Sequence, residues 1–243
     1  MKKALIAFIS ILVIGYLVFS VIYFNDSSQN QECKAFEVII KDSVETQFVK
    51  EQDIVNLIKN KDLYPVGKTM KEINTLSIRD TILNNKLIQT AEVYNTPKGA
   101  IVANITQRKP ILRVISDANG SFYIDDKRER MPVSINFSVY VPIATGAIDE
   151  EYAKNELYDF ASFLNENPDW DAWIEQIVVK PNKEVELIPR AGDFKILFGK
   201  LNNYSEKFSK FALFIEKGLN AVGWNRYSEI NLKYDNQVVC TKK

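Results

Sequence analysis

Paired carboxylates are the residues of this chain whose chemistry would matter most. They gather in three groups: Asp125 with Asp126, Asp149 to Glu151, and Asp169 with Asp171. Two carboxylates held across a cleft can hydrolyse a glycosidic bond. All three groups fall in expected loops or helix starts, where acidic side chains are commonly solvated or cap a helix. We therefore predict no catalytic residue, and an anchored cell-wall hydrolase is the enzymatic alternative.

Composition narrows the chemistry further. The chain has no histidine among its 243 residues, which excludes serine triads with histidine, histidine-bearing zinc sites and histidine general bases. Its 31 basic and 31 acidic residues balance, so a basic face for nucleic acid is not indicated. We predict no metal, no cofactor and no small-molecule substrate.

Two basic motifs have simpler interpretations than a ligand site. Gly67-Lys68-Thr69 is similar to the end of a phosphate-binding loop, but that motif needs a glycine where Asp62 stands. A turn followed by a helix cap explains it. Lys127, Arg128 and Arg130 form a small cluster that we interpret as a solvated loop rather than an anion site.

The N-terminal segment predicts a membrane anchor. Residues Ala4 to Phe24 include no charged side chain, and a helix of that length would reach roughly 30 Å, the thickness of a bilayer's hydrocarbon core. Lys2 and Lys3 before it favour a cytoplasmic N-terminus, with the rest of the chain outside. The run is longer than the core of a cleaved signal peptide, which is the alternative. The two cysteines, Cys33 and Cys240, would then face an oxidising compartment, where a disulfide or two solitary thiols are both open.

Beyond a short polar linker, the first elements follow the order β-α-α-β-β. Alternation over Ala35 to Lys41 predicts a strand, and Phe48 to Asn60 has the apolar spacing of a helix. Thr69 and Glu72 have capping-box spacing, which predicts a second helix from there to about Asn85. Two strands follow at Leu87 to Asn95 and Ala100 to Gln107, joined by a hairpin turn.

The remainder is predicted to be a mostly antiparallel β domain with two flanking helices. The helices are expected at Asp149 to Asn165 and at Leu201 to Leu219, and aromatic residues of the second should pack on the sheet. The last two strands are expected at Ser228 to Tyr234 and Gln237 to Thr241. A terminal strand often lies at a sheet edge, where it can pair with another chain.

These features resemble the bacterial cell-division family FtsQ, called DivIB in Gram-positive bacteria. The resemblance rests on several short stretches in order: Ala91-Glu92-Val93-Tyr94, Gln107 to Pro110, Tyr123-Ile124-Asp125, Met131-Pro132-Val133, and the tail Ser228 to Asp235. It implies an α+β architecture with a transmembrane anchor at 1–24, a linker at 25–32, a POTRA-like domain at 33–109 and a β domain at 110–243.

The resemblance also implies a function, that of a non-enzymatic scaffold at the division septum of the cytoplasmic membrane. Family members recruit and regulate septal peptidoglycan synthesis, bind the FtsB–FtsL pair through their last strands, and contact other division proteins through the POTRA-like domain. Carried over by position, the partner-binding residues are Lys233, Tyr234, Asn236, Gln237, Val238, Val239 and Cys240. Asn231 and Lys233 depart from the aspartate and arginine that are usual there. Because lysine lacks the bidentate fork of arginine, a partner carboxylate would be held less rigidly. The alternative function is that of an envelope assembly or secretion factor, since POTRA modules also serve there.

Overall fold

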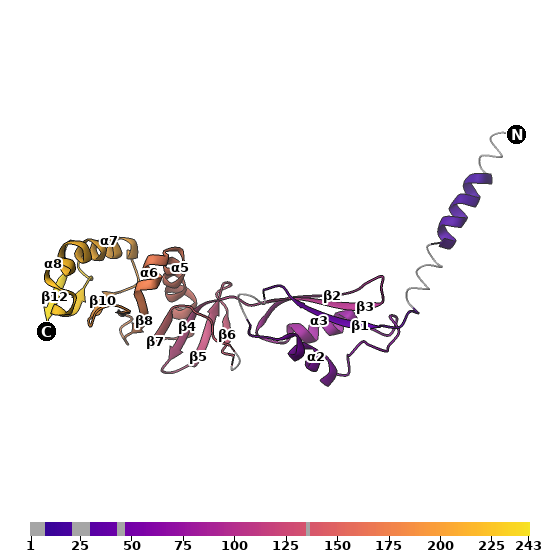
Figure 1. Ribbon diagram of the computed structural model, residues 1–243, viewed down its shortest axis with the longest axis horizontal. Helices are drawn as coiled ribbons and strands as arrows, with labels where there is room; N and C mark the ends of the chain where they lie inside the picture. The colour runs from indigo at the N-terminus through magenta and orange to yellow at the C-terminus, as the bar shows by residue number, and fades with distance from the viewer. Residues whose placement is uncertain (1–7, 21–29, 43–46, 135–136) are drawn as a thin grey trace. The chain divides into compact units, whose positions relative to one another are not determined.

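The computed structural model describes residues 8–20, 30–42, 47–134 and 137–243 (Figure 1). The chain divides into two compact units, Met1–Gln107 and Arg108–Lys243. The sequence predicts a boundary after Lys109. Arg108 contacts the second unit, since its guanidinium lies 2.7 Å from the Asp125 carboxylate.

The prediction of a membrane-spanning helix is wrong for the described residues. A helix covers residues 8–20, and the ends of the expected anchor, 1–7 and 21–24, lie outside the described residues. No helix in the described part of the chain has both the length and the apolar character needed to cross a bilayer.

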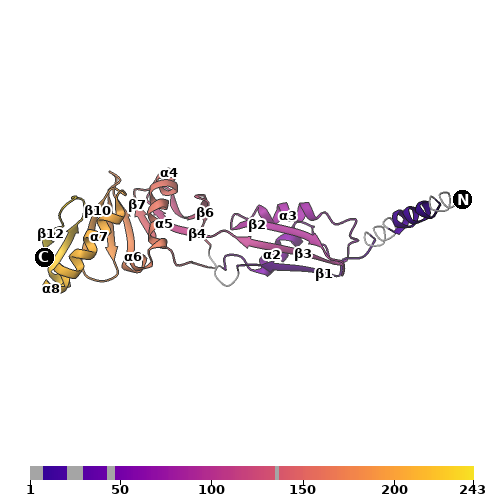
Figure 2. The ribbon, with the colours of Figure 1, turned by 90° about the horizontal axis from the view of Figure 1, so that it is seen from above.

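The first unit is a three-stranded sheet covered by two helices (Figure 2). Its elements are β1 (Ala35–Ile40), α2 (Glu51–Asn60), α3 (Thr75–Leu83), β2 (Ile88–Asn95) and β3 (Ala100–Gln107). The spatial order is β1-β3-β2, with β1 parallel and β2 antiparallel to β3. The helices pack through fully buried isoleucines, two on α2 and two on α3: Ile54, Ile58, Ile78 and Ile82. The predicted order β-α-α-β-β agrees with this arrangement.

The second helix begins later than the capping-box pattern predicts. The Thr69 backbone N–H and hydroxyl do donate to the Glu72 carboxylate, at 3.0 and 2.9 Å. This contact closes a turn that is not continued as a helix. Asn74 is the residue that caps α3, because its side-chain oxygen accepts the Ser77 N–H at 3.0 Å.

The second unit is built on a nine-stranded mixed sheet. Its strands are β4 (Pro110–Ser116), β5 (Gly120–Asp125), β6 (Arg130–Pro132), β7 (Ile143–Gly146), β8 (Ile174–Val179), β9 (Val185–Pro189), β10 (Lys195–Gly199), β11 (Tyr227–Asn231) and β12 (Val239–Lys242). The spatial order is β12-β11-β10-β9-β8-β7-β4-β5-β6. Most neighbours are antiparallel as expected, but β7 pairs parallel to both β4 and β8, and β11 pairs parallel to β10.

Helical segments cover one face of this sheet (Figure 1). They are α4 (Glu150–Tyr152), the π-helical turn η1 (Ala153–Leu157), α5 (Tyr158–Glu166), α6 (Pro168–Trp173), α7 (Tyr204–Phe214), the π-helical turn η2 (Ile215–Leu219), α8 (Asn220–Val222) and the 3₁₀ turn η3 (Trp224–Arg226). Aromatic rings fill the space beneath them: Trp170 stacks on Phe208 with centroids 4.5 Å apart, and Phe208 lies 5.3 Å from Phe198. The aromatic stripe of α7 is therefore core, as expected.

The two cysteines lie in different units. Cys33 is buried beside β1, where its thiol donates to the Ala35 carbonyl, and Cys240 is half-buried on β12. Both are free thiols among the described residues.

Candidate partner-binding edge and neighbouring pockets

Strand β12 lies at one end of the nine-stranded sheet. It pairs antiparallel with β11, with Val239 opposite Asn231 and Cys240 opposite Ile230. Among the described residues no strand pairs with its other side. An edge strand presents a row of backbone N–H and C=O groups that another chain can pair with.

The outward-facing groups of β12 follow from its register. The Lys243 N–H donates to the Arg226 carbonyl, so it points toward β11. Backbone groups alternate sides along a strand, which places the N–H and C=O of Cys240 and Lys242 on the outer side. The N–H of Val239 lies on the inner side, facing β11.

Side chains of β12 and the preceding tail divide between core and surface. Val238 and Cys240 pack against the core cluster, whereas Val239 is 42% exposed. Burial raises the pKa of the Cys240 thiol. Tyr234 is 49% exposed, and its carbonyl accepts a hydrogen bond from the Lys210 ammonium. Asn236 and Gln237 are exposed in the turn region before β12. The structure thus brings the seven expected residues to one end of one sheet.

Lys233 has both an aliphatic and a charged contact. Its aliphatic stem lies over Gly199, where an added Cβ would come within 2.8 Å of the Lys233 Cγ. Gly199 has a φ of +78°, so a side chain there would be strained as well as crowded. The Lys233 ammonium lies 3.3 Å from the Glu184 carboxylate. The positive charge is therefore held at the surface beside β10.

Two of the three carboxylate groups considered for catalysis contain a residue with a structural partner. Asp125, only 2% exposed, accepts hydrogen bonds from the backbone of Lys127 and Glu129 and pairs with Arg108. Asp149 caps α4 by accepting the Tyr152 N–H at 2.8 Å. Burial raises the pKa of Asp171. Among the described residues no group of three potential ligands could hold a metal ion.

The basic cluster after β5 is engaged with acidic side chains. Arg128 pairs with Asp159 and Arg130 with Glu150. Lys154, on η1, contacts both Glu129 and Glu150. These pairs join the β5–β6 hairpin to the helical layer and neutralise Arg128 and Arg130.

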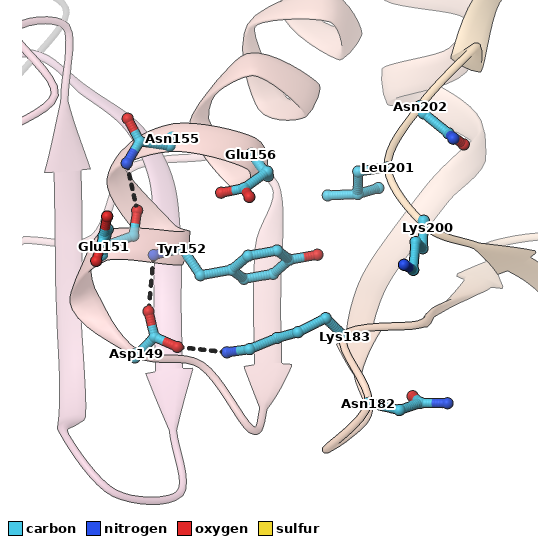
Figure 3. A pocket seen from close by; sticks show the side chains of 10 residues that line it. All are labelled: Asp149, Glu151, Tyr152, Asn155, Glu156, Asn182, Lys183, Lys200, Leu201 and Asn202. Atoms are coloured by element: carbon cyan, nitrogen blue, oxygen red, sulfur yellow. Dashed lines mark hydrogen bonds and ion pairs between the residues drawn. The ribbon is translucent and has the colours of Figure 1, made fainter.

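A pocket of about 670 Å³ opens at the end of the sheet where β7, β8 and β10 finish (Figure 3). One wall is the α4–η1 segment, with Tyr152 and Glu156. The other is the segment after β10, with Lys200, Leu201 and Asn202. Lys183 crosses the floor, where it bonds the Asp149 carboxylate and the Ala147 carbonyl and lies 4.7 Å from the Tyr152 ring. Sequence patterns do not indicate this pocket, because its walls come from three separate loops.

A smaller cavity of about 260 Å³ shares Lys200 and Asn202 with this pocket and extends to Lys233 and Asp235. Lys207 lines it and is largely buried. Its ammonium donates to the Lys200 carbonyl and to the Asn202 side-chain oxygen, at 2.8 and 2.9 Å. Burial lowers the pKa of Lys207.

Comparison with known families identifies both units. Residues 31–106 match the model of the POTRA-like domain, and residues 109–241 match the model described as FtsQ/DivIB, C-terminal related. No curated protein matches the chain. Proteins of this family act in cell division and are not enzymes. Because the second match alone spans more than half of the 243 residues, the chain belongs to the FtsQ/DivIB family.

Proposed function

We propose that this protein is a scaffold of the bacterial division machinery that receives a strand of a partner protein along β12. The observation that carries the proposal is the position of β12 at the end of the sheet, within a domain of the FtsQ/DivIB family. The outward groups of Cys240 and Lys242 supply the backbone pairing. The exposed side chains of Tyr234, Asn236, Gln237 and Val239 supply further contacts.

The partner we propose is an FtsB–FtsL-like pair. Lys233 would meet a carboxylate of that partner at the start of the added strand. Its ammonium is a point charge that also contacts Glu184. The contact would therefore raise the association rate of the partner more than its affinity. Through this pairing the protein would recruit or regulate septal peptidoglycan synthesis at the division site.

The first unit offers a second edge for other division proteins. Strand β2 lies at the end of the three-stranded sheet and carries Glu92 and Tyr94 on its exposed face, with Tyr94 44% exposed. This edge supports a docking role for the POTRA-like domain. Crosslinking from position 92 in cells, compared with crosslinking from position 233, would show whether the two edges hold different partners.

The strand-addition proposal is tested by deleting an outward-facing donor. Lys242→Pro removes the N–H that points away from β11, a change that an edge strand tolerates. We expect it to lose the partner that is crosslinked to the tail of the unaltered protein. Lys242→Ala is the matched control, because it removes the same side chain and keeps the N–H. Equal recovery of the partner with both variants would exclude pairing along this edge.

The alternative of an envelope assembly factor rests on the POTRA-like match at residues 31–106. Depletion separates the two functions. Filamentous cells with normal envelope proteins would support division, whereas loss of envelope proteins before any division defect would support assembly.

A further inference from the structure

The pocket of about 670 Å³ contains a polar group with no partner (Figure 3). Tyr152 is 92% buried, since only 8% of its surface is exposed, and its hydroxyl points into the pocket. Within the described part of the chain, this hydroxyl makes no hydrogen bond. Among the described residues no side-chain nitrogen or oxygen is both sealed from solvent and without a partner, so this hydroxyl is accessible from the cavity, where a ligand atom could bond it.

The two walls carry opposite unpaired charges. The Lys200 ammonium and the Glu156 carboxylate both line the pocket, and neither forms a hydrogen bond or an ion pair with another described residue. Glu156 lies one helical turn after Tyr152, and Figure 3 shows its carboxylate beside the Tyr152 ring. Lys183 is bound to Asp149, whereas the Glu151 carboxylate, which also belongs to the lining, forms no ion pair with a described residue.

We propose that this pocket binds a small zwitterion of the amino-acid class, either a free amino acid or a short linear peptide. The ligand carboxylate would accept hydrogen bonds from the Tyr152 hydroxyl and the Lys200 ammonium. The ligand ammonium would face the Glu156 carboxylate. Leu201 and the Tyr152 ring supply the apolar surface between the two ends, and the volume lies within the range of about 300–1,000 Å³ typical of small-molecule sites.

The local fold keeps this arrangement ready for a ligand. Lys183 lies over the Tyr152 ring and is tied to Asp149 and to the Ala147 carbonyl, so the floor is fixed by three contacts. Asp149 in turn caps the helix that carries Tyr152. Burial, helped by the negative charge of Glu156, raises the pKa of Tyr152 to about 12. The hydroxyl therefore keeps its proton at neutral pH and acts as a donor.

The proposal is tested by titrating the ¹⁵N-labelled full chain with glycine, diglycine and triglycine and following the amide signals by NMR. We expect shifts at residues of the pocket, with N-acetylglycine and glycinamide much weaker because each lacks one charge. The length series separates a free amino acid from a peptide as the preferred form. Equal binding of N-acetylglycine, or shifts confined to other parts of the protein, would overturn the zwitterion site.

Three variants assign the contacts. Tyr152→Phe keeps the ring and removes the hydroxyl, and Lys200→Met keeps the length and removes the charge; each should weaken binding about tenfold. Glu156→Gln should reduce the preference for glycine over N-acetylglycine. Tyr140→Phe is the control, since that exposed hydroxyl contacts Arg190 away from the pocket, and binding should not change. Unchanged affinity in both Tyr152→Phe and Lys200→Met, with spectra of a folded protein, would refute the assignment. None of these variants alters β12, so this test is independent of the partner proposal.

Discussion

The Arg108–Asp125 ion pair is buried, so a substitution of either residue should affect stability strongly. Both side chains are largely buried, at 13% and 2% exposure, and Arg108 also donates to the carbonyls of Glu129 and Arg130. Removing one partner of such a pair leaves a buried charge without compensation. We expect Asp125→Ala to lower the free energy of unfolding by about 3–5 kcal/mol, measured by urea denaturation.

The matched control for this prediction is the Arg79–Asp80 pair, which is equally close but exposed. Exposed pairs contribute less than about 1 kcal/mol, so Asp80→Ala should have a small effect. Similar losses in the two variants would mean that burial does not set the cost at Asp125.

Asp149 makes stability depend on pH at the acid end. The hydrogen bond from Lys183, followed by the one from the Tyr152 backbone, lowers the pKa of this carboxyl below its ordinary value of 3.8. A carboxyl whose pKa is lower in the folded state stabilises the fold above its unfolded pKa and loses that effect as the pH falls through the folded pKa. The stability gap between the unaltered protein and Asp149→Asn should therefore be constant near neutral pH and shrink below about pH 4.

The partner of Asp149 provides the check on this prediction. Lys183→Met should show the same acid-dependent loss, and the double variant should lose little more than either single variant, because both act on one interaction. Thermal melts across the acid range measure all three. If the stability difference between the unaltered protein and Asp149→Asn stays the same at low pH, the charge of the Asp149 carboxylate is not its cause.

At the scale of elements, two residues, Asn74 and Thr69, are candidates for the cap at the start of α3. Asn74 accepts the Ser77 N–H, whereas Thr69 and Glu72 contact each other outside the helix. We expect Asn74→Ala to cost about 0.5–2 kcal/mol of unfolding free energy and Thr69→Ala to cost less, because the Thr69 contact lies outside the helix and caps none of its N–H groups. Chemical denaturation measures both losses. A larger loss for Thr69→Ala than for Asn74→Ala would contradict the assignment of Asn74 as the cap.

Sequence patterns predicted the strands of the first unit better than the start of its second helix. Strands β1, β2 and β3 were predicted nearly to the residue, β1 from its alternation of apolar and polar side chains, and β2 and β3 from the hairpin turn between them. The helix start was misplaced because the Thr69–Glu72 contact forms whether or not a helix follows it. Helix α6 was missed since its six residues are too few for a helical period to show.

At the scale of the whole molecule, the sheet order was beyond sequence reasoning. Strand β7 lies between β4 and β8, which are distant in the chain, and the parallel pairing of β11 with β10 depends on the helices between them. The tail residues were found through a family resemblance, not through spacing. The pocket around Tyr152 was not found, because Lys183 and Lys200 join it only when three loops meet. The apolar N-terminal run predicted a membrane span, and no helix in the described part of the chain is long and apolar enough to be one.

Cell length should distinguish variants of the sheet edge from variants of the pocket. If partner pairing along β12 is what division requires, a strain whose sole copy carries Lys242→Pro should filament, while Lys242→Ala should divide normally. Tyr152→Phe should leave cell length unchanged under the same conditions, because it alters no group on β12. Cell length is measured by microscopy and protein abundance by immunoblot, so that loss of the protein is not mistaken for loss of pairing. Normal division with Lys242→Pro at full abundance would show that the outward N–H of this strand is dispensable.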